Sequence, residues 1–276
     1  MSDNYISTQP PTEIDITVAH EARVYDYWLG GKDNYPADRA LGDAIAEHIP
    51  TIKTMARANR AFLTRAVRYL VGEAGITQFL DIGTGIPTAG NTHEVAQRLD
   101  PAARIVYVDK DPIVLAHARA LMSSTPQGRT RFIHADLHDP RSILDHPALA
   151  DTLDPTEPVA IMLVAIMMYF RDSDHPEDVI GTLLDAVPSG SHLVITHPTA
   201  DFDAAAMAAV TAAAEASGIA FHPRSQADTA TLFTGTTLVD PGLVPVATWR
   251  PDLTDRPTPV TKADSAWYWA GIGHKP

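Results

Sequence analysis

Three aspartates stand at the ends of three successive apolar runs. Asp81 lies in TQFLDIG, Asp109 ends ARIVYVD and Asp136 ends TRFIHAD. A single Asp at such a place often only caps the following helix, so one alone is weak evidence for a site. Parallel strands bring their carboxyl ends to the same edge of a sheet, and open α/β sheets bind ligands there. Three acids at that edge therefore predict a ligand-binding site.

The loop after the first run indicates the kind of ligand. Gly83 and Gly85 expose the main chain and tolerate positive φ, so a ligand can approach closely. A dinucleotide fingerprint would continue to a third glycine, but Thr88 stands there, and Pro87 offers no N–H to a phosphate. Asp81 would repel a pyrophosphate, whereas it could accept a hydrogen bond from an ammonium group. The pattern favours a nucleoside that carries an amino acid, and hence S-adenosylmethionine over NAD.

The other two acids suit the remaining parts of that cofactor. The carboxylate of Asp109 could accept hydrogen bonds from both ribose hydroxyls. Asp136 could accept one from the exocyclic amine of adenine. Each acid therefore has a partner within a single nucleoside ligand.

Alternating strands and helices must position these acids. The β-rich runs are almost continuously apolar, as expected for strands that are covered on both faces. Helical segments separate them, and one begins with Asp111 as a cap before Pro112. This alternation predicts an α/β fold with a mostly parallel sheet and right-handed crossovers. The predicted strands span residues 77–83, 103–109, 130–136, 158–167 and 191–197.

Both ends of the chain depart from this alternation. Residues 242–251 and 265–276 are β-like and leave no room between them for a crossover helix, which predicts an antiparallel ending. Residues 1–75 carry no strand signal. They read as a polar tail followed by three helices. The first helix ends at a Gly pair, the second begins near Pro36, and the third runs from about Thr51 to Val71. In the third helix, Asn59 interrupts an apolar stripe and should be buried against a partner or a ligand.

Two phrases, YWLGGKDNY and QFLDIGTGIPT, make the chain resemble a known family. This family comprises S-adenosylmethionine-dependent methyltransferases that were long catalogued only as a domain of unknown function. The resemblance covers nearly the whole chain. It implies a Rossmann-like class I methyltransferase with a mostly parallel seven-stranded sheet whose last strand is antiparallel. We accordingly divide the chain into a tail and N-terminal helical cap at 1–75 and an S-adenosylmethionine-binding methyltransferase domain at 76–276.

The resemblance also implies which residues contact S-adenosyl-L-methionine. The expected contacts are Asp81, Gly83, Gly85, Asp109, Asp136 and Leu137. Further candidates that lie beside these positions or after the fourth strand are Thr84, Lys110 and Ala165. Gly31 could contact the cofactor through its main chain. Arg57 or Arg60 could pair with the methionine carboxylate, although surface salt bridges are an alternative for both.

Methyl transfer requires an aligned nucleophile and a water-free site, and it needs a base only if the attacking atom carries a proton. Candidate catalytic residues are Tyr169, just after the fourth strand, and His197, at the end of the fifth, although a lone His is more often structural. The family pattern has a His where this chain has Met168, so a base in that loop loses support. The predicted substrate pocket contains Tyr25, Tyr27, Lys32, Asp33, Tyr35 and Met168, although the tyrosines could equally fill a core.

Composition narrows the possible partners. The chain has 276 residues and a net charge of −13, which disfavours nucleic acid. No apolar stretch is long enough to cross a membrane, and the polar N-terminus is unlike a secretory signal, so a cytoplasmic location is expected. Cysteine is absent, and no His spacing suggests a metal site.

The leading interpretation is a methyltransferase that acts on oxygen or nitrogen of a small-molecule acceptor. The alternative is a non-catalytic S-adenosylmethionine-binding regulatory protein. A homodimer is possible in either case.

Overall fold

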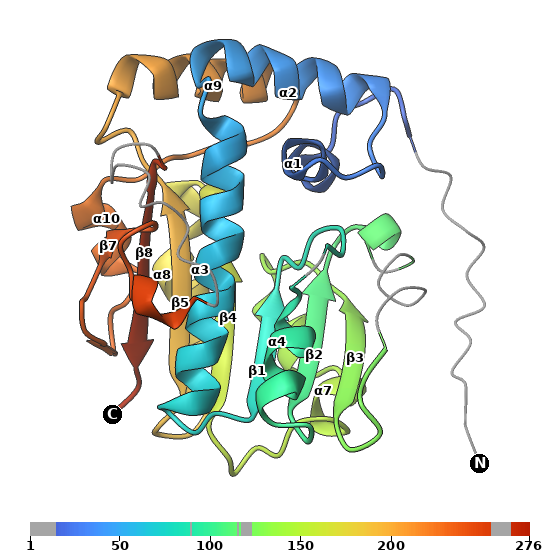
Figure 1. Ribbon diagram of the computed structural model, residues 1–276, viewed down its shortest axis with the longest axis vertical. Coiled ribbons are helices and arrows are strands. Elements are labelled where there is room, and N and C mark those ends of the chain that lie inside the picture. The colour runs from blue at the N-terminus through green and yellow to red at the C-terminus, as the bar shows by residue number, and fades with distance from the viewer. Residues whose placement is uncertain (1–14, 89, 115, 117–122, 255–265) are drawn as a thin grey trace.

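A twisted sheet with helices on both sides forms the centre of the protein (Figure 1). The structure is a computed structural model that describes residues 15–88, 90–114, 116, 123–254 and 266–276. Within these residues the sheet has eight strands in the order β3-β2-β1-β4-β5-β8-β6, with β7 paired to β8. The strands are β1 Gln78–Ile82, β2 Arg104–Asp109, β3 Arg129–His134, β4 Val159–Val164, β5 His192–Pro198, β6 Thr237–Leu238, β7 Val244–Pro245 and β8 Tyr268–His274.

The sheet confirms the predicted fold class. Strands β1 to β5 pair in parallel, whereas β8 is antiparallel to β5, β6 and β7. β6 pairs with residues 273–274 of β8 and β7 with residues 269–270, so these two short strands share one position beside β8. The eight strands therefore occupy seven positions, as in the Rossmann-like class I arrangement. The strand order reverses between β1 and β4, which makes their carboxyl ends the expected ligand site.

The chain between β6 and β8 forms less strand than predicted. Residues 242–251 were expected to be β-like, but only Val244 and Pro245 pair with β8. Pro245 has no N–H to donate to a ladder, and its carbonyl accepts a bond from the Thr248 N–H at 2.8 Å, which closes a turn. The predicted helix that begins at Pro112 lies largely outside the described residues.

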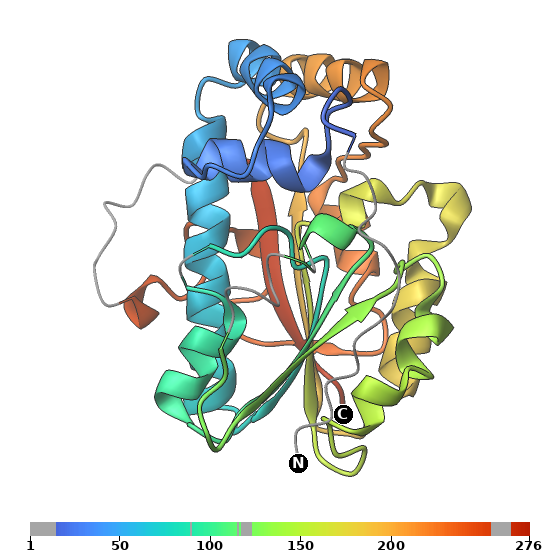
Figure 2. The ribbon, with the colours of Figure 1, turned by 90° about the vertical axis from the view of Figure 1, so that its right-hand side faces the viewer.

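Two helical layers enclose the strands. Helices α3 Ile52–Gly72 and α4 Thr92–Leu99 cover one face, and α6 Pro140–Leu144, α7 Pro147–Ala150 and α8 Pro176–Asp185 cover the other (Figure 2). Burial explains the apolar runs, since every residue of β1 and β5 is buried. Outside the sheet, these two layers and the cap, the described elements are α10 Gln226–Thr231 and the short 3-10 helices η1 Met167–Tyr169, η2 Asp172–Asp174 and η3 Pro251–Leu253.

A cap lies over the carboxyl ends of the strands. It contains α1 Glu21–Leu29 and α2 Pro36–His48, and α9 Ala204–Ala216 packs beside α2 although it comes from the C-terminal half of the chain (Figures 1 and 2). Gly30 ends α1 at φ 85°, a conformation that glycine adopts without strain. The three predicted N-terminal helices are thus confirmed, but the cap also includes a helix from the C-terminal half.

Helix α3 belongs to both the cap and the sheet layer. Its apolar stripe is buried, and so is Asn59, whose amide donates a hydrogen bond to the Tyr25 hydroxyl at 2.9 Å. Farther along, the buried guanidinium of Arg65 donates to the carbonyl oxygens of Trp249 at 2.7 Å and Val246 at 2.6 Å. Side chains of α3 and of the sheet form one apolar cluster. The helix is therefore fixed to the body along its length.

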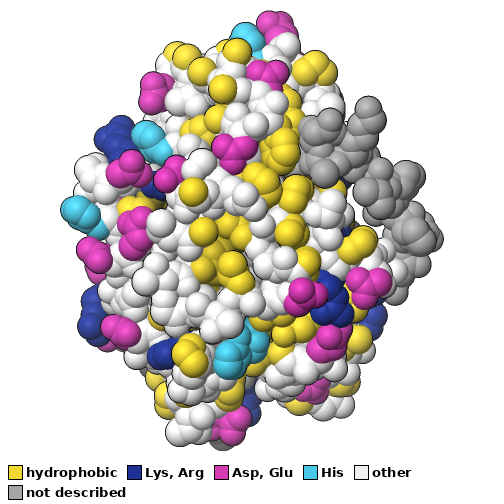
Figure 3. All heavy atoms as spheres, turned by 90° about the vertical axis from the view of Figure 1, so that its left-hand side faces the viewer, with side chains coloured by type: hydrophobic (Ala, Val, Ile, Leu, Met, Phe, Trp, Pro, Cys, Tyr) yellow, Lys and Arg dark blue, Asp and Glu magenta, His cyan; other side chains and the backbone are white. Residues whose placement is uncertain are grey.

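The surface and the helices bear on possible partners. On the face shown in Figure 3, acidic side chains lie scattered among Lys and Arg, and apolar side chains gather near its middle. None of the described helices combines the length and the apolar character needed to cross a bilayer.

Candidate functional site

A hollow lies at the carboxyl ends of β1 to β4, beneath α1. It encloses about 1160 Å³ of space, including solvent at its mouth. Twelve of the predicted site residues line it: Tyr25, Arg60, Asp81, Gly83, Thr84, Gly85, Asp109, Lys110, Asp136, Leu137, Ala165 and Tyr169. Residues that are far apart in the sequence thus meet at the predicted edge of the sheet.

The turn after β1 requires glycine at position 83. Gly83 has φ 74°, and a Cβ there would lie 2.6 Å from the side chain of Ile166. Its N–H donates to the Val108 carbonyl oxygen at 2.9 Å, which holds the turn against the end of β2. Gly85 also has positive φ, at 65°. The main chain at this turn therefore lies bare beside the hollow.

Asp109 is fixed in place by backbone donors. Its carboxylate accepts hydrogen bonds from the N–H groups of Gly85 and Asp111, both at 2.9 Å. Burial raises the pKa of Asp109, and these two bonds partly oppose the rise. Each oxygen keeps a further lone pair, so the carboxylate can still accept bonds from two ligand hydroxyls.

Asp81 is buried at the floor of the hollow. One of its oxygens accepts a hydrogen bond from the Thr92 hydroxyl at 2.6 Å. Burial raises the pKa of Asp81 to about 6, although the Thr92 bond and the charge of Arg60 lower it in part. A buried carboxylate lacks the hydrogen bonds that water donates to it in solution. It therefore favours a positively charged ligand group, which can donate hydrogen bonds in place of water.

Asp136 lies at the more open side. Its carboxylate accepts hydrogen bonds from the backbone N–H of His138 at 2.9 Å and from the His138 ring at 2.8 Å. Burial raises the pKa of Asp136, but the hydrogen bonds from His138 and the charges of His138 and Lys110 together outweigh it, so the net shift of the pKa is downward. The ring of His138 stacks on Phe170 with centroids 4.0 Å apart. Asp136 is thus an ionised acceptor beside stacked rings.

Ala165 has an unusual backbone after β4. Its φ is 57°, a region that residues with a side chain seldom adopt. The Ala165 N–H donates to the Thr196 carbonyl oxygen at 3.3 Å. Such conformations gather at functional sites, and Ala165 lines the hollow.

The two predicted arginines are placed differently. Arg60 lines the hollow and donates to the Gly90 carbonyl oxygen at 3.2 Å and to Asn91 Oδ1 at 3.4 Å. Arg57 is exposed and does not line the hollow. Of the pair, Arg60 is the one that can meet a ligand carboxylate there.

The N-terminus of α1 forms a roof that sequence reasoning missed. Glu21 pairs with Lys110 at 3.0 Å, and His20 Nδ1 lies 3.3 Å from a carboxylate oxygen of Asp111. Both pairs join the cap to the chain just after β2. Burial raises the pKa of Glu21, but the charges of His20 and Lys110 and the hydrogen bonds to its carboxylate together lower it by more. A lone Glu and a lone His have no spacing that marks them, so only the start of the helix could have indicated them.

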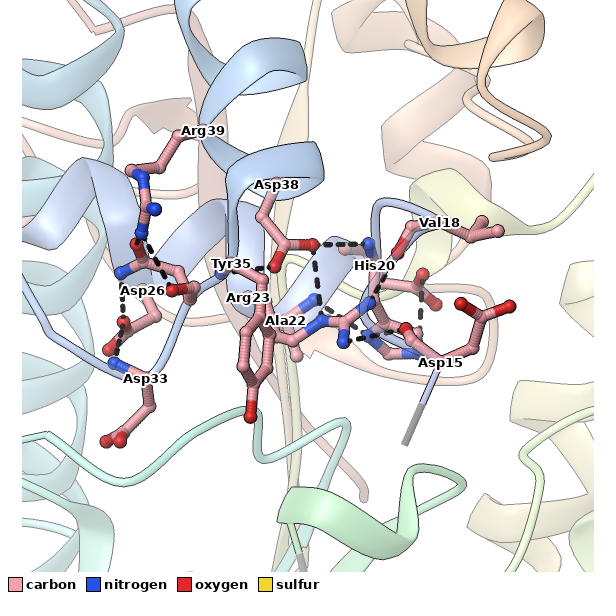
Figure 4. Close-up of polar contacts among 12 residues, drawn as sticks. Asp15, Val18, His20, Ala22, Arg23, Asp26, Asp33, Tyr35, Asp38 and Arg39 are labelled. Atoms are coloured by element: carbon pink, nitrogen blue, oxygen red, sulfur yellow. Dashed lines mark hydrogen bonds and ion pairs between the residues drawn. The ribbon is translucent and has the colours of Figure 1, made fainter. Parts of the chain in front are cut away.

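The polar run GGKDNY is engaged largely within the cap (Figure 4). The Asp26 carboxylate accepts hydrogen bonds from the Asp33 N–H at 3.0 Å and from the Asn34 amide at 2.8 Å. A Cβ on Gly31 would overlap this carboxylate, so glycine is required there. Asp26 lines the hollow, whereas Gly31, Lys32 and Asp33 do not.

Asp38 holds the other half of this turn. It is fully buried and accepts hydrogen bonds from the N–H groups of His20 at 2.9 Å and Tyr35 at 2.7 Å. Arg23 Nε lies 3.2 Å from the same carboxylate (Figure 4). Tyr27 and Tyr35 lie within this cap turn, residues 26–39, and neither lines the hollow.

The two candidate catalytic residues differ in exposure to the hollow. Tyr169 lines it, and burial raises its pKa well above the usual range. His197 is fully buried outside it, with Nδ1 2.9 Å from the Pro198 carbonyl oxygen and Nε2 3.2 Å from Arg224. Burial lowers the pKa of His197 to about 4. With Nδ1 donating and Nε2 accepting, the ring has no lone pair for a substrate proton, which favours a structural role.

Comparison with known proteins decides the family. A family model described as S-adenosyl methyltransferase matches residues 7–276. The chain belongs to this family. A DUF574 family protein from Streptomyces avermitilis MA-4680 is 44% identical, with a TM-score of 0.91 over 95% of this chain and 99% of its own. A proposed methyltransferase from Thermobifida fusca YX is 42% identical, with a TM-score of 0.86 over 98% and 99%.

A more distant structure shares the fold alone. The plantazolicin methyltransferase BpumL is 13% identical, with a TM-score of 0.54 over 92% of this chain and 96% of its own. No curated protein matches the chain. The protein is thus an S-adenosylmethionine-dependent methyltransferase with a class I, Rossmann-like fold, and S-adenosyl-L-methionine is its cofactor. Among the described residues, no group of His, Asp and Glu is arranged to hold a metal ion.

Proposed function

We propose that this methyltransferase methylates an oxygen or nitrogen atom of a small molecule in the hollow beneath α1. The observation that carries the proposal is the convergence of Asp81, Asp109 and Asp136 on one hollow that a helix covers. A covered site favours a small acceptor over a macromolecule, because the acceptor must enter beneath the roof that the Glu21–Lys110 pair holds down.

The lining residues fit the two ends of the cofactor's amino-acid part. Asp81 is the buried carboxylate that would accept hydrogen bonds from the ammonium group. Arg60, which already faces the hollow, would hold the carboxylate. Asn59 adds a second acceptor for the ammonium group, since its buried Oδ1 has no hydrogen-bond partner among the described residues. These three groups come from β1 and α3, so their separation is set by rigid elements.

The nucleoside part fits the remaining acids. Asp109 would accept from the two ribose hydroxyls, and Gly83 leaves space for close approach along the main chain. Asp136 would accept from the adenine amine, and Leu137 offers an apolar surface beside it. When bound, S-adenosylmethionine supplies an electrophilic methyl group on a positively charged sulfur.

The chain's own contribution to methyl transfer is alignment and the exclusion of water. Tyr25 and Tyr169 line the hollow beneath the roof and would orient the acceptor. The Glu21 carboxylate lines the hollow at the N-terminus of α1, so it can take up the proton of a hydroxyl or amine acceptor. Its pKa is lowered, so it is ionised at neutral pH and can accept a hydrogen bond, while the same lowering makes it a weak base.

Charge and composition support further parts of the proposal. The net charge of −13 disfavours nucleic acid as the acceptor. The absence of cysteine from the chain is compatible with a cytoplasmic location. A homodimer stays a prediction, for which the mass of the protein in solution is the direct measurement.

Two experiments test the proposal. Calorimetry with S-adenosylhomocysteine should give saturable binding, whereas NAD should give none. A cell extract incubated with methyl-labelled cofactor and the protein should carry label in molecules below about 1 kDa, with Asp109→Ala protein as the control. Label confined to protein or nucleic acid would overturn the small-molecule assignment, and saturation by NAD without binding of S-adenosylhomocysteine would overturn the site.

A further inference from the structure

A second hollow lies within the cap. It encloses about 610 Å³ of space, including solvent at its mouth, and helices α1, α2, α3 and α9, with η1 and β8, contribute to its walls. Nearly all of the lining side chains are apolar: Val24, Trp28, Leu41, Ile45, Ile49, Ile52, Met55, Met168, Pro198, Met207, Val210, Ala214, Ile219 and Phe221. Walls of this kind hold water poorly, so the hollow favours an apolar ligand.

The second hollow borders the first. Glu21, Tyr25 and Tyr169 line both. These three residues lie at the junction, where a bound cofactor and anything held in the cap would face each other. The predicted pocket residue Met168 lines only the apolar side.

The polar groups of the second hollow are few. Apart from the junction residues, its one ionisable side chain among the described residues is Tyr268. The Tyr25 hydroxyl is occupied, because it donates to the Ala56 carbonyl oxygen at 3.1 Å and accepts from Asn59 at 2.9 Å. No described residue hydrogen-bonds to the hydroxyls of Tyr169 and Tyr268. These two groups are available to a ligand.

The remaining walls suit an apolar body that carries rings. Met55, Met168 and Met207 provide flexible, polarisable side chains that adapt to irregular shapes and contact aromatic rings favourably. Trp28 and Phe221 add aromatic surface. Ligand sites commonly have this composition, with an apolar lining and a few polar groups that fix orientation.

We propose that the second hollow receives the body of the methyl acceptor, and that this acceptor is an apolar, ring-bearing molecule. Its single hydroxyl or amine lies at the junction and donates a hydrogen bond to Glu21, within reach of Tyr169. This inference rests on the proposed function, because it assigns the substrate class of the same site.

The test uses 2-naphthol as a probe of the second hollow. The protein is saturated with S-adenosylhomocysteine, and 2-naphthol is titrated while its fluorescence is followed. Two variants of α9 are matched: Ala214 lines the hollow and Ala212 is exposed on the same helix. Ala214→Phe should weaken probe binding at least about tenfold, since it fills the space, while Ala212→Phe leaves it unchanged. Both variants should keep wild-type affinity for S-adenosylhomocysteine.

The outcomes separate the two levels of the argument. Failure of the wild-type protein to bind 2-naphthol, or equal binding by Ala214→Phe, would overturn the acceptor class even if S-adenosylhomocysteine binds. Absence of S-adenosylhomocysteine binding would overturn the proposed function instead. If Ala214→Phe does not fold, Ile219→Trp at a half-buried wall position replaces it and is held to the same criterion.

Discussion

The carboxyl edge of the sheet and the cap turn at residues 26–39 are both polar regions among apolar surroundings, yet they use their acids differently. At the sheet edge, Asp81 and Asp109 face a hollow with acceptor capacity left over. In the cap turn, the Asp38 carboxylate already accepts hydrogen bonds from the N–H groups of His20 and Tyr35 and pairs with Arg23. Polarity in an apolar setting therefore does not identify a ligand site. What matters is whether the chain itself satisfies the polar groups.

The largest expected effect belongs to the cap turn. Asp38→Ala should lower the free energy of unfolding by about 3–5 kcal/mol, because it leaves the buried Arg23 without its counter-charge. Urea denaturation measures this loss, with Asp43→Ala on the exposed side of α2 as the control. If Asp38→Ala keeps its stability but no longer binds S-adenosylhomocysteine, the turn belongs to the site and the contrast is broken.

The sheet edge should show the opposite pattern. Asp109→Ala should weaken S-adenosylhomocysteine binding about 100-fold, since it removes two charge-assisted hydrogen bonds to ribose. Calorimetry measures the affinity, and Asp145→Ala, an exposed acid after α6, should bind like the wild type. Unchanged affinity in Asp109→Ala would remove the ribose assignment.

The pH dependence of binding should report on Asp81. Its pKa is raised by burial to about 6, and only the ionised form can pair with an ammonium group. Affinity for S-adenosylhomocysteine should therefore fall up to about tenfold per unit as pH drops below 6. The groups that face Asp81 are Thr92, Arg60 and Asp109, and the raised pKa of Asp109 acts in the same direction.

Asp81→Asn isolates this contribution, because the amide does not titrate in this range. The variant should bind more weakly and lose most of the pH dependence. The unliganded wild type should in turn become less stable as pH rises from about 4 to 6, since the folded state holds a proton that the unfolded state releases. Binding that is as steep in Asp81→Asn as in the wild type would assign the titration to another group.

The smallest effect is expected at Lys32. It is exposed and does not line the hollow, so Lys32→Ala should change S-adenosylhomocysteine affinity less than about twofold and stability by less than about 0.5 kcal/mol. A tenfold loss of affinity or of methyl transfer would instead restore the prediction from sequence that this residue belongs to the substrate pocket.

Sequence patterns were sufficient where the determinant is local. Continuous apolar runs predict strands buried on both faces, and Asp81, Asp109 and Asp136 follow from where those runs end. The same reasoning overestimated the strand at 242–251, because a turn closed by the Thr248 N–H on the Pro245 carbonyl oxygen ends the ladder there.

Contacts between distant parts of the chain could not be predicted in this way. Arg224, which donates a hydrogen bond to His197, lies 27 residues from it in the sequence. The carbonyl groups of Val246 and Trp249, which accept hydrogen bonds from Arg65, lie 181 and 184 residues from it. The position of α9 in the cap likewise depends on tertiary packing against α2. Glu21 lies at the junction because α1 packs over the sheet edge, and no residue spacing in the sequence predicts this packing.

The dual membership of α3 has a practical consequence for protein engineering. Phe79, Ile105 and Met162 share their apolar cluster with side chains of this helix. A truncated chain that starts at residue 76 would present this face of the sheet to water as a sticky, aggregation-prone surface. An exchange of the cap between relatives, made to exchange their substrates, should therefore transfer residues 15–48 together with α9. Helix α3 should stay with the sheet of its own protein.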